Sequence, residues 1–179
     1  MKMNLKVIAS INGKVLYEKE LDPWVVGITV ILHGYRYVTT ALAFQDTSNT
    51  NRSHSTAAAR ANAGSGIDTF GPVVGTGTTD PAWGDYNLGT KIAHGTATGQ
   101  LSYGAVTFNA PVTDGNDRYF EVIRVFTNLS GASITVYEFG IICYTGSYYF
   151  LVCRDVNASG IEIPNGQALT LTYKIKITI

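Results

Sequence analysis

The feature that most constrains the fold of this chain is an unbroken alternation of apolar and polar residues over positions 169–179. Side chains in a β-strand point to opposite faces with a period of two, so the alternation predicts a strand with one apolar face. The apolar positions run from Leu169 to Ile179, and threonines and lysines stand between them. Such a strand must be covered in a sheet. We expect it to pair within its own subunit, because the turn at 164–166 lets it fold back locally.

Short stretches typical of strands recur along the rest of the chain, separated by turn residues. Asn12-Gly13 divides two alternating runs, 5–11 and 15–21, and this dipeptide is the strongest hairpin signal. Further strands are expected at 24–32, 35–44, 70–74, 101–109, 119–129, 134–144 and 148–155. Helical periodicity is nearly absent. The sequence therefore predicts an all-β fold, an antiparallel β-sandwich of jelly-roll-like type in a single domain spanning 1–179.

Two segments depart from simple alternation. Residues 120–126 and 139–144 are apolar on both faces, which is typical of strands covered on two sides in a core or a subunit interface. Residues 45–66, in contrast, lose nearly all hydrophobic signal. A structureless stretch of this length is unusual in a compact domain. We interpret 45–66 as a long polar arm or loop that a neighbouring subunit orders, or whose alanine-rich part forms one helical turn.

Charge is balanced and sparse. Thirteen basic and thirteen acidic residues make up 15% of the chain, against roughly 25% in typical soluble domains. Neutral polar residues and eleven tyrosines stand in their place, a composition that favours contact between like subunits. No basic run indicates a nucleic-acid partner, and no apolar stretch reaches the length of a membrane helix. The first residues lack the apolar run of a signal peptide, so secretion by the usual route is not expected.

Residues that could carry chemistry are scattered. The histidines His33, His54 and His94 have no second ligand or carboxylate at a useful spacing. No Gly-x-Ser-x-Gly elbow is present, and the glycines of 75–79 are not followed by the Lys-Ser/Thr of a phosphate loop. Residues 114–117 offer oxygen ligands for Ca²⁺ but also have the composition of a β-turn. We therefore expect a non-enzymatic protein without a cofactor.

The two cysteines, Cys143 and Cys153, flank a predicted hairpin turn at 145–147. Pairing across that turn places Cys143 opposite about residue 149 and Cys153 opposite about residue 139. At about 3.3 Å per residue, this separation exceeds what a disulfide spans. The sequence predicts two free, buried thiols that behave as small hydrophobic residues.

Several phrases of the sequence resemble virion structural proteins of tailed phages and related prokaryotic viruses. The pattern is Val-Gly-x-Gly-Thr, a Pro-containing spacer and then Asp-Tyr-x-Leu. The phrases are 73–92, 99–104, 124–136, 138–141, 151–155 and 166–173. The resemblance covers roughly residues 70–179 and implies a β-rich auxiliary capsid, decoration or head-fibre subunit that forms homo-oligomers. It brings no catalytic residues with it.

Three functions follow as hypotheses. The first is a virion protein that self-assembles and contacts other virion proteins such as a major capsid protein. The second is a subunit of a cellular extracellular filament or sheath, and the third is a carbohydrate- or receptor-binding module that uses tyrosine and tryptophan surfaces. The residues expected at assembly interfaces are Asn51, Arg52, His54, Trp83, Tyr86, Tyr148, Tyr149, Ile175 and Ile177.

Overall fold

The computed structural model describes residues 2–21, 42–54 and 59–178 of the chain, and these are all-β with antiparallel sheets. The expected strand at 24–32 lies outside these residues, as does most of the one at 35–44. The strands are β1 (Lys2–Ile11), β2 (Lys14–Leu21), β3 (Leu42–Gln45), β4 (Asn51–His54), β5 (Gly71–Gly75), β6 (Ser102–Tyr103), β7 (Thr107–Phe108), β8 (Val112–Asp114), β9 (Asp117–Thr127), β10 (Ile134–Tyr144), β11 (Tyr149–Ile163) and β12 (Ala168–Thr178).

The larger sheet has seven strands in the order β2-β1-β12-β9-β6, with β7 and β8 also paired to β9. Its middle strand is β12, which pairs with β1 on one side and β9 on the other. The prediction that the terminal strand pairs within its own chain is confirmed. The side chains on its apolar face are buried from Leu169 to Tyr173, whereas Ile177 is 41% exposed. The apolar side chains of β12 therefore become less buried toward the end of the strand.

The smaller sheet has three strands in the order β11-β10-β5. The middle strand β10 is buried on both faces from Glu138 to Cys143, as its apolar sequence predicts. The prediction that residues 120–126, in β9, are covered on both faces is wrong. Val122 and Phe126 are buried on one face, but Val125 on the other face is 39% exposed, and Arg124 lies on the buried face.

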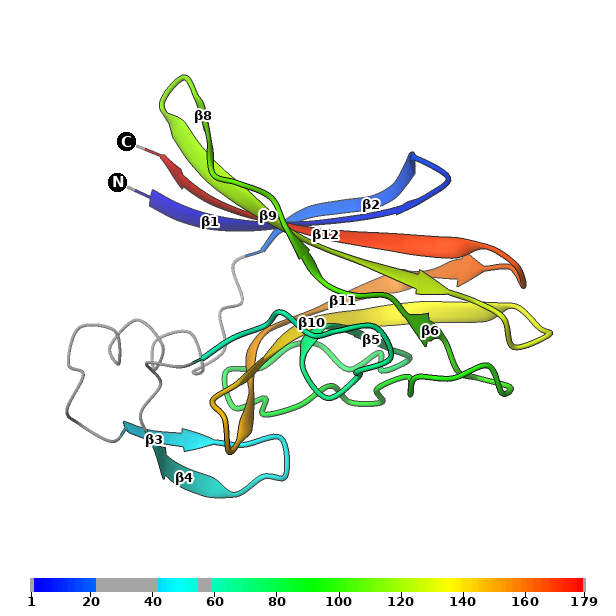
Figure 1. Ribbon diagram of the computed structural model, residues 1–179, viewed down its shortest axis with the longest axis horizontal. Helices are drawn as coiled ribbons and strands as arrows, with labels where there is room; N and C mark the ends of the chain where they lie inside the picture. Colours follow the sequence, from blue (N-terminus) through cyan, green and yellow to red (C-terminus); the bar gives the residue numbers. More distant parts are fainter. Residues whose placement is uncertain (1, 22–41, 55–58, 179) are drawn as a thin grey trace.

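Figure 1 shows the backbones of the two sheets next to each other, and buried side chains from both sheets belong to one hydrophobic cluster. The Tyr17 ring of β2 stacks on the Phe139 ring of β10 at a centroid distance of 5.5 Å. Buried Asp155 of β11 accepts hydrogen bonds from the Tyr17 hydroxyl at 2.6 Å and the Lys19 ammonium at 2.7 Å. Burial and this acidic partner raise the pKa of Tyr17. The polar link thus fastens the edge of one sheet to the other.

The expected arm at 45–66 differs from the prediction of a structureless segment. It contains β4, which forms a hairpin with β3 just before it, and residues 59–66 pack against their own chain without forming a helical turn. The Arg60 and Tyr144 backbones exchange two hydrogen bonds, and Ala63 is 1% exposed. Short side chains let this backbone approach the sheet closely, so the described parts of 45–66 are ordered by the same chain.

Cys143 and Cys153 are free and buried, as predicted. In the pairing of β10 with β11, Cys143 lies opposite Phe150 and Cys153 lies opposite Ile141, one and two residues away from the expected partners. The reason is that the turn holds four residues and a bulge follows Ile141. Burial raises the pKa of the Cys143 thiol to about 12.

Residues 114–117 form the hairpin turn between β8 and β9, where Asp117 lies 3.1 Å from the Lys176 ammonium.

Candidate functional site

Three of the sequence phrases that carry the resemblance, 73–92, 138–141 and 151–155, meet at a buried carboxylate, Glu138 of β10. Its Oε1 accepts hydrogen bonds from the Gly89 amide at 2.6 Å and from Arg154 Nε at 2.5 Å. Its Oε2 accepts one from the Thr90 amide at 3.2 Å. Glu138 is fully buried, so its charge needs these partners. The carboxylate fastens the loop of residues 76–92, here called the anchored loop, to the smaller sheet.

Arg154 of β11 extends this network toward the surface. Besides Glu138, its guanidinium donates to Asp85 Oδ2 at 2.9 Å and to the Thr79 carbonyl at 2.8 Å. The Asp85 carboxylate also accepts the Ala82 amide, which closes a turn of the anchored loop. Burial works against the charged form of Arg154, but Glu138 and Asp85 raise its pKa overall. The two carboxylates therefore keep this arginine charged.

Two glycines of the anchored loop region are explained by the same carboxylate. A Cβ atom built on Gly75 or Gly77 would lie 2.5 Å from Glu138 Oε2. On Gly75 it would also lie 2.6 Å from the Thr90 carbonyl oxygen. The Gly-x-Gly of the sequence is thus required because backbone and carboxylate approach closely.

A polar pocket of about 490 Å³ opens beside this network. One wall is the turn 47–49, and the other is the anchored loop with Arg154 at its base. The lining residues are Thr47, Ser48, Asn49, Thr79, Asp85, Tyr86, Asn87, Leu88, Gly89 and Arg154. The Asn87 side-chain amide donates to the Thr47 carbonyl at 3.3 Å, and this bond joins the two walls.

Asp46 holds the first wall in shape. Its Oδ1 accepts the amides of Ser48 and Thr50 at 2.9 and 3.0 Å, and its Oδ2 lies 2.7 Å from Arg52 Nε. Burial alone would raise the pKa of Asp46, but the Arg52 and amide hydrogen bonds outweigh it and lower the pKa. Asn49 takes a left-handed backbone conformation, which Asn tolerates. The turn is therefore preformed.

Aromatic rings gather beside the first wall, at the tip of the β10–β11 hairpin. Tyr144 and Tyr149 stack at 4.8 Å between centroids, and Phe70 lies 5.5 Å from Tyr144. The Arg52 guanidinium lies over the Tyr148 ring at 4.7 Å. Three residues expected at an interface, Arg52, Tyr148 and Tyr149, are thus brought together, but each is half-buried against its own chain.

The other residues expected at interfaces are more dispersed. Asn51 is exposed on β4, and His54 ends that strand. Trp83 is 68% exposed on the anchored loop, and Tyr86 lines the pocket. Ile175 and Ile177 belong to β12 in the larger sheet, away from the hairpin β3–β4, which forms a sheet of its own.

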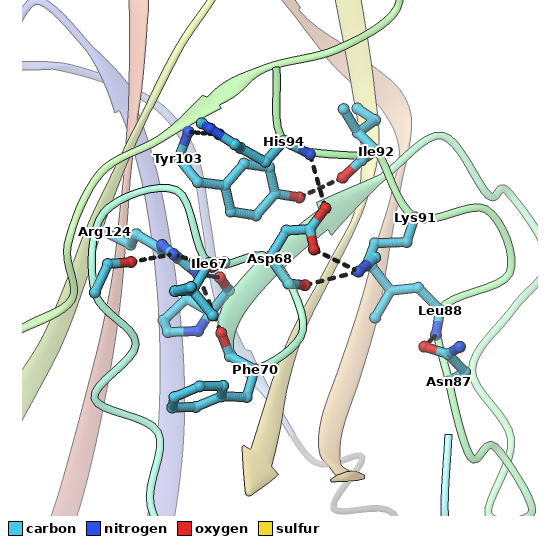
Figure 2. Close-up of polar contacts among 12 residues, drawn as sticks. Ile67, Asp68, Phe70, Asn87, Leu88, Lys91, Ile92, His94, Tyr103 and Arg124 are labelled. Atoms are coloured by element: carbon cyan, nitrogen blue, oxygen red, sulfur yellow. Dashed lines mark hydrogen bonds and ion pairs between the residues drawn. The ribbon is translucent and has the colours of Figure 1, made fainter. Parts of the chain in front are cut away.

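Arg124 forms a second buried network, shown in Figure 2. Its five N–H donors meet five backbone carbonyls and, among the described residues, no carboxylate. The acceptors are Gly64, Ile67, Phe70, Pro72 and Gly104. The guanidinium also lies 4.8 Å from the centre of the Tyr103 ring. Burial lowers the pKa of Arg124 to about 10. At neutral pH it remains charged and clamps residues 64–72 to β9.

Asp68 and its neighbours continue this clamp (Figure 2). The Lys91 ammonium donates to the Asp68 carbonyl at 2.7 Å, and the His94 amide donates to Asp68 Oδ2 at 2.7 Å. His94 Nδ1 accepts the Tyr103 amide at 3.1 Å, while the Tyr103 hydroxyl donates to the Ile92 carbonyl at 2.6 Å. His94 thus has a structural partner.

Comparisons with known proteins give no relative to compare these networks with. The chain matches no protein-family model, no curated protein and no solved structure. In the described part of the chain, no helix is long and apolar enough to span a membrane, and no group of three metal-binding side chains is present.

Sequence reasoning missed the buried charges that organise these loops: Arg124, Glu138, Arg154 and Asp155. Each stands next to apolar residues within its strand, and this placement is the sequence signal that could have identified them. A charged residue at a position where the period-two pattern demands a buried side chain indicates an internal ion pair or a cage of carbonyl groups.

Proposed function

We propose that this protein is a non-enzymatic structural subunit of a virus particle, where it assembles with copies of itself and contacts other virion proteins such as a major capsid protein. The sequence phrases that resemble phage virion proteins support this proposal. The buried charges of those phrases, Arg124, Glu138 and Arg154, all serve to hold loops on sheets. Such a framework suits a protein whose task is to present a fixed surface.

The observation that carries the self-assembly proposal is the uneven distribution of exposed apolar side chains among the described residues. The larger sheet bears most of them and the smaller sheet bears none. Those on strands of the larger sheet are Val15, Leu16, Phe108, Val112, Val125 and Ile177. Exposed apolar area in one region is typical of a protein contact surface.

One part of that sheet is free of charge across four strands. Cross-strand register aligns Val15 of β2, Ser10 of β1, Thr170 of β12 and Val125 of β9 in a row on the face away from the core. The next row contains Ile8, Thr172 and Ile123, and at its β2 end stands Glu18, which is ion-paired with Lys6. We name the seven uncharged residues of the two rows the neutral rows. A second copy of the chain fits them, because two such surfaces meet without burying unpaired charge.

The proposed fold follows from the same arrangement. The two sheets act as the layers of a β-sandwich of jelly-roll-like type, in one domain. Antiparallel pairing throughout and the shared hydrophobic cluster support this interpretation.

Light scattering coupled to size-exclusion chromatography tests the assembly, with negative-stain microscopy of the same fractions. The wild-type chain should form an oligomer with a defined shape, such as a ring, shell or short fibre. Val125→Lys should shift the distribution toward monomer, since it places a charge in the neutral rows. Val112→Lys is the matched control, because Val112 is 45% exposed on β8, outside the neutral rows.

Two results would contradict the proposal. One is a wild-type chain that remains monomeric at every concentration tested. The other is a Val125→Lys variant that assembles as the wild type does. Far-ultraviolet circular dichroism spectra of both variants must match that of the wild type, so that a lost oligomer is not a lost fold. Melting temperatures do not serve here, because loss of assembly lowers them by itself.

A further inference from the structure

We infer that the polar pocket beside Arg154 is a binding site for a neutral, polyhydroxylated ligand of the size of a monosaccharide unit. The pocket volume of about 490 Å³ falls within the range of small-ligand sites. This inference does not depend on self-assembly, because every lining residue belongs to one chain.

The walls of the pocket are preformed. Asp46 fixes the turn 47–49 through two amides, Asp85 fixes the anchored loop through the Ala82 amide, and Asn87 joins the two. A ligand entering the pocket therefore does not have to order its surroundings, which is the main cost of binding at a flexible surface.

Unused hydrogen-bonding groups point to the chemistry of the ligand. Arg154 carries five N–H donors, but it makes three hydrogen bonds to described residues although its side chain is only 3% exposed. Asp85 accepts through Oδ2, and its Oδ1 has no partner among the described residues. The hydroxyls of Ser48, Thr79 and Tyr86 also make no hydrogen bond to described residues. Donors and acceptors side by side match the hydroxyl groups of a sugar, each of which donates and accepts.

The charge of the site argues against an anion. Arg154 is compensated by Glu138 and Asp85, so an anion entering the pocket finds no uncompensated positive charge. A cation finds no net negative charge either, because the charged residues that line the pocket are Arg154 and Asp85, one of each sign.

Titration of the ¹⁵N-labelled protein by NMR tests the inference, with glucose, galactose, mannose and N-acetylglucosamine as separate probes. At least one sugar should shift the amide signals of residues 47–49 and 85–89 at millimolar concentration. Ser48→Ala combined with Tyr86→Phe should weaken that affinity by about tenfold or more, because two hydrogen-bonding groups are lost. Neither hydroxyl has a partner in the described structure, so the fold should be kept.

Tyr137→Phe serves as the matched control, because it removes a half-buried tyrosine hydroxyl on β10, outside the residues that line the pocket. It should leave the affinity unchanged. The inference is overturned if none of the four sugars shifts the pocket amides, or if the double variant binds as the wild type does. Inorganic phosphate is the fifth probe, and tighter binding of phosphate than of any sugar would also overturn it.

Discussion

Two buried arginines each hold a loop segment in the described part of this protein, residues 76–92 for Arg154 and residues 64–72 for Arg124, and they do so by different means. Arg154 works through charge, since it contacts the carboxylates of Glu138 and Asp85. Arg124 works through hydrogen bonds to neutral carbonyls, and all five of its acceptors are backbone oxygens. One loop is fastened by an ion network and the other by a cage of carbonyl groups.

The difference shows how a fixed loop can be specified without regular secondary structure. A carbonyl cage depends on the path of the backbone, so it tolerates changes in the loop side chains. An ion network depends on particular side chains, so it requires Asp85 in the loop and glycines beside the carboxylate. We expect the anchored loop to respond more strongly to point substitution than residues 64–72 do.

The largest effect is expected from Glu138→Ala. It leaves the Arg154 charge buried with only Asp85 as a partner and removes the acceptor of the Gly89 and Thr90 amides. Breaking a buried pair in this way costs about 3–5 kcal/mol. Urea unfolding measures the loss, with Glu162→Ala as the control because Glu162 is exposed on β11. A loss equal to that of the control would show that the ion network does not hold the loop.

Arg124→Met should cost less, about 2–3 kcal/mol, because it leaves neutral carbonyls rather than a charge without a partner. Arg124→Lys should recover only part of the loss, since an ammonium has three donors and lacks the planar fork. Hydrogen exchange should show faster opening around residues 64–72 in both variants. If Arg124→Met lowered the free energy of unfolding more than Glu138→Ala does, the expectation that the ion network contributes more to stability than the carbonyl cage would be wrong.

The strands of this protein could be predicted because alternation and turn residues are local signals. Asn12-Gly13 predicts the first hairpin and 169–178 the last strand, and both are confirmed. The pairing of β12 with β1 joins residues 158 to 176 positions apart, and its pairing with β9 joins residues 41 to 61 positions apart. No local pattern encodes which strands become neighbours. The sequence predicts a structureless 45–66 because β4, the four-residue strand within it, is polar throughout and leaves no periodic apolar signal.

The site was less predictable than the fold. The sequence indicates Trp83 and Tyr86 as interface residues; Tyr86 lines the pocket, whereas Trp83 does not. Glu138 and Arg154 give no sign of a site, because each stands next to apolar residues within its strand. They are 16 residues apart, and Arg154 is 69 residues from Asp85, so only the folded chain brings the three together.

Gly75→Ala tests whether close contact between the backbone and the Glu138 carboxylate fixes the start of the anchored loop. The new methyl group would lie 2.5 Å from Glu138 Oε2 and 2.6 Å from the Thr90 carbonyl, so the backbone has to move. We expect a loss of about 1–3 kcal/mol. Gly84→Ala is the matched control, because a Cβ there meets no atom within 4 Å. Equal melting temperatures for the two variants would mean that the loop adapts and is not fixed by the carboxylate.

The smallest effect is expected at Asp46, where an ion pair with Arg52 lies nearer the surface than either arginine network. The folded-state pKa of Asp46 lies below the ordinary value, so its contribution is complete above the unfolded pKa of about 3.9 and is lost as the pH falls through the folded value. Amide signals of Ser48 and Thr50 should therefore change below about pH 4. In Asp46→Asn the Ser48 and Thr50 signals should no longer titrate. If these two amides titrated in Asp46→Asn as they do in the wild type, the Asp46 carboxylate would not be the group that holds this wall of the pocket.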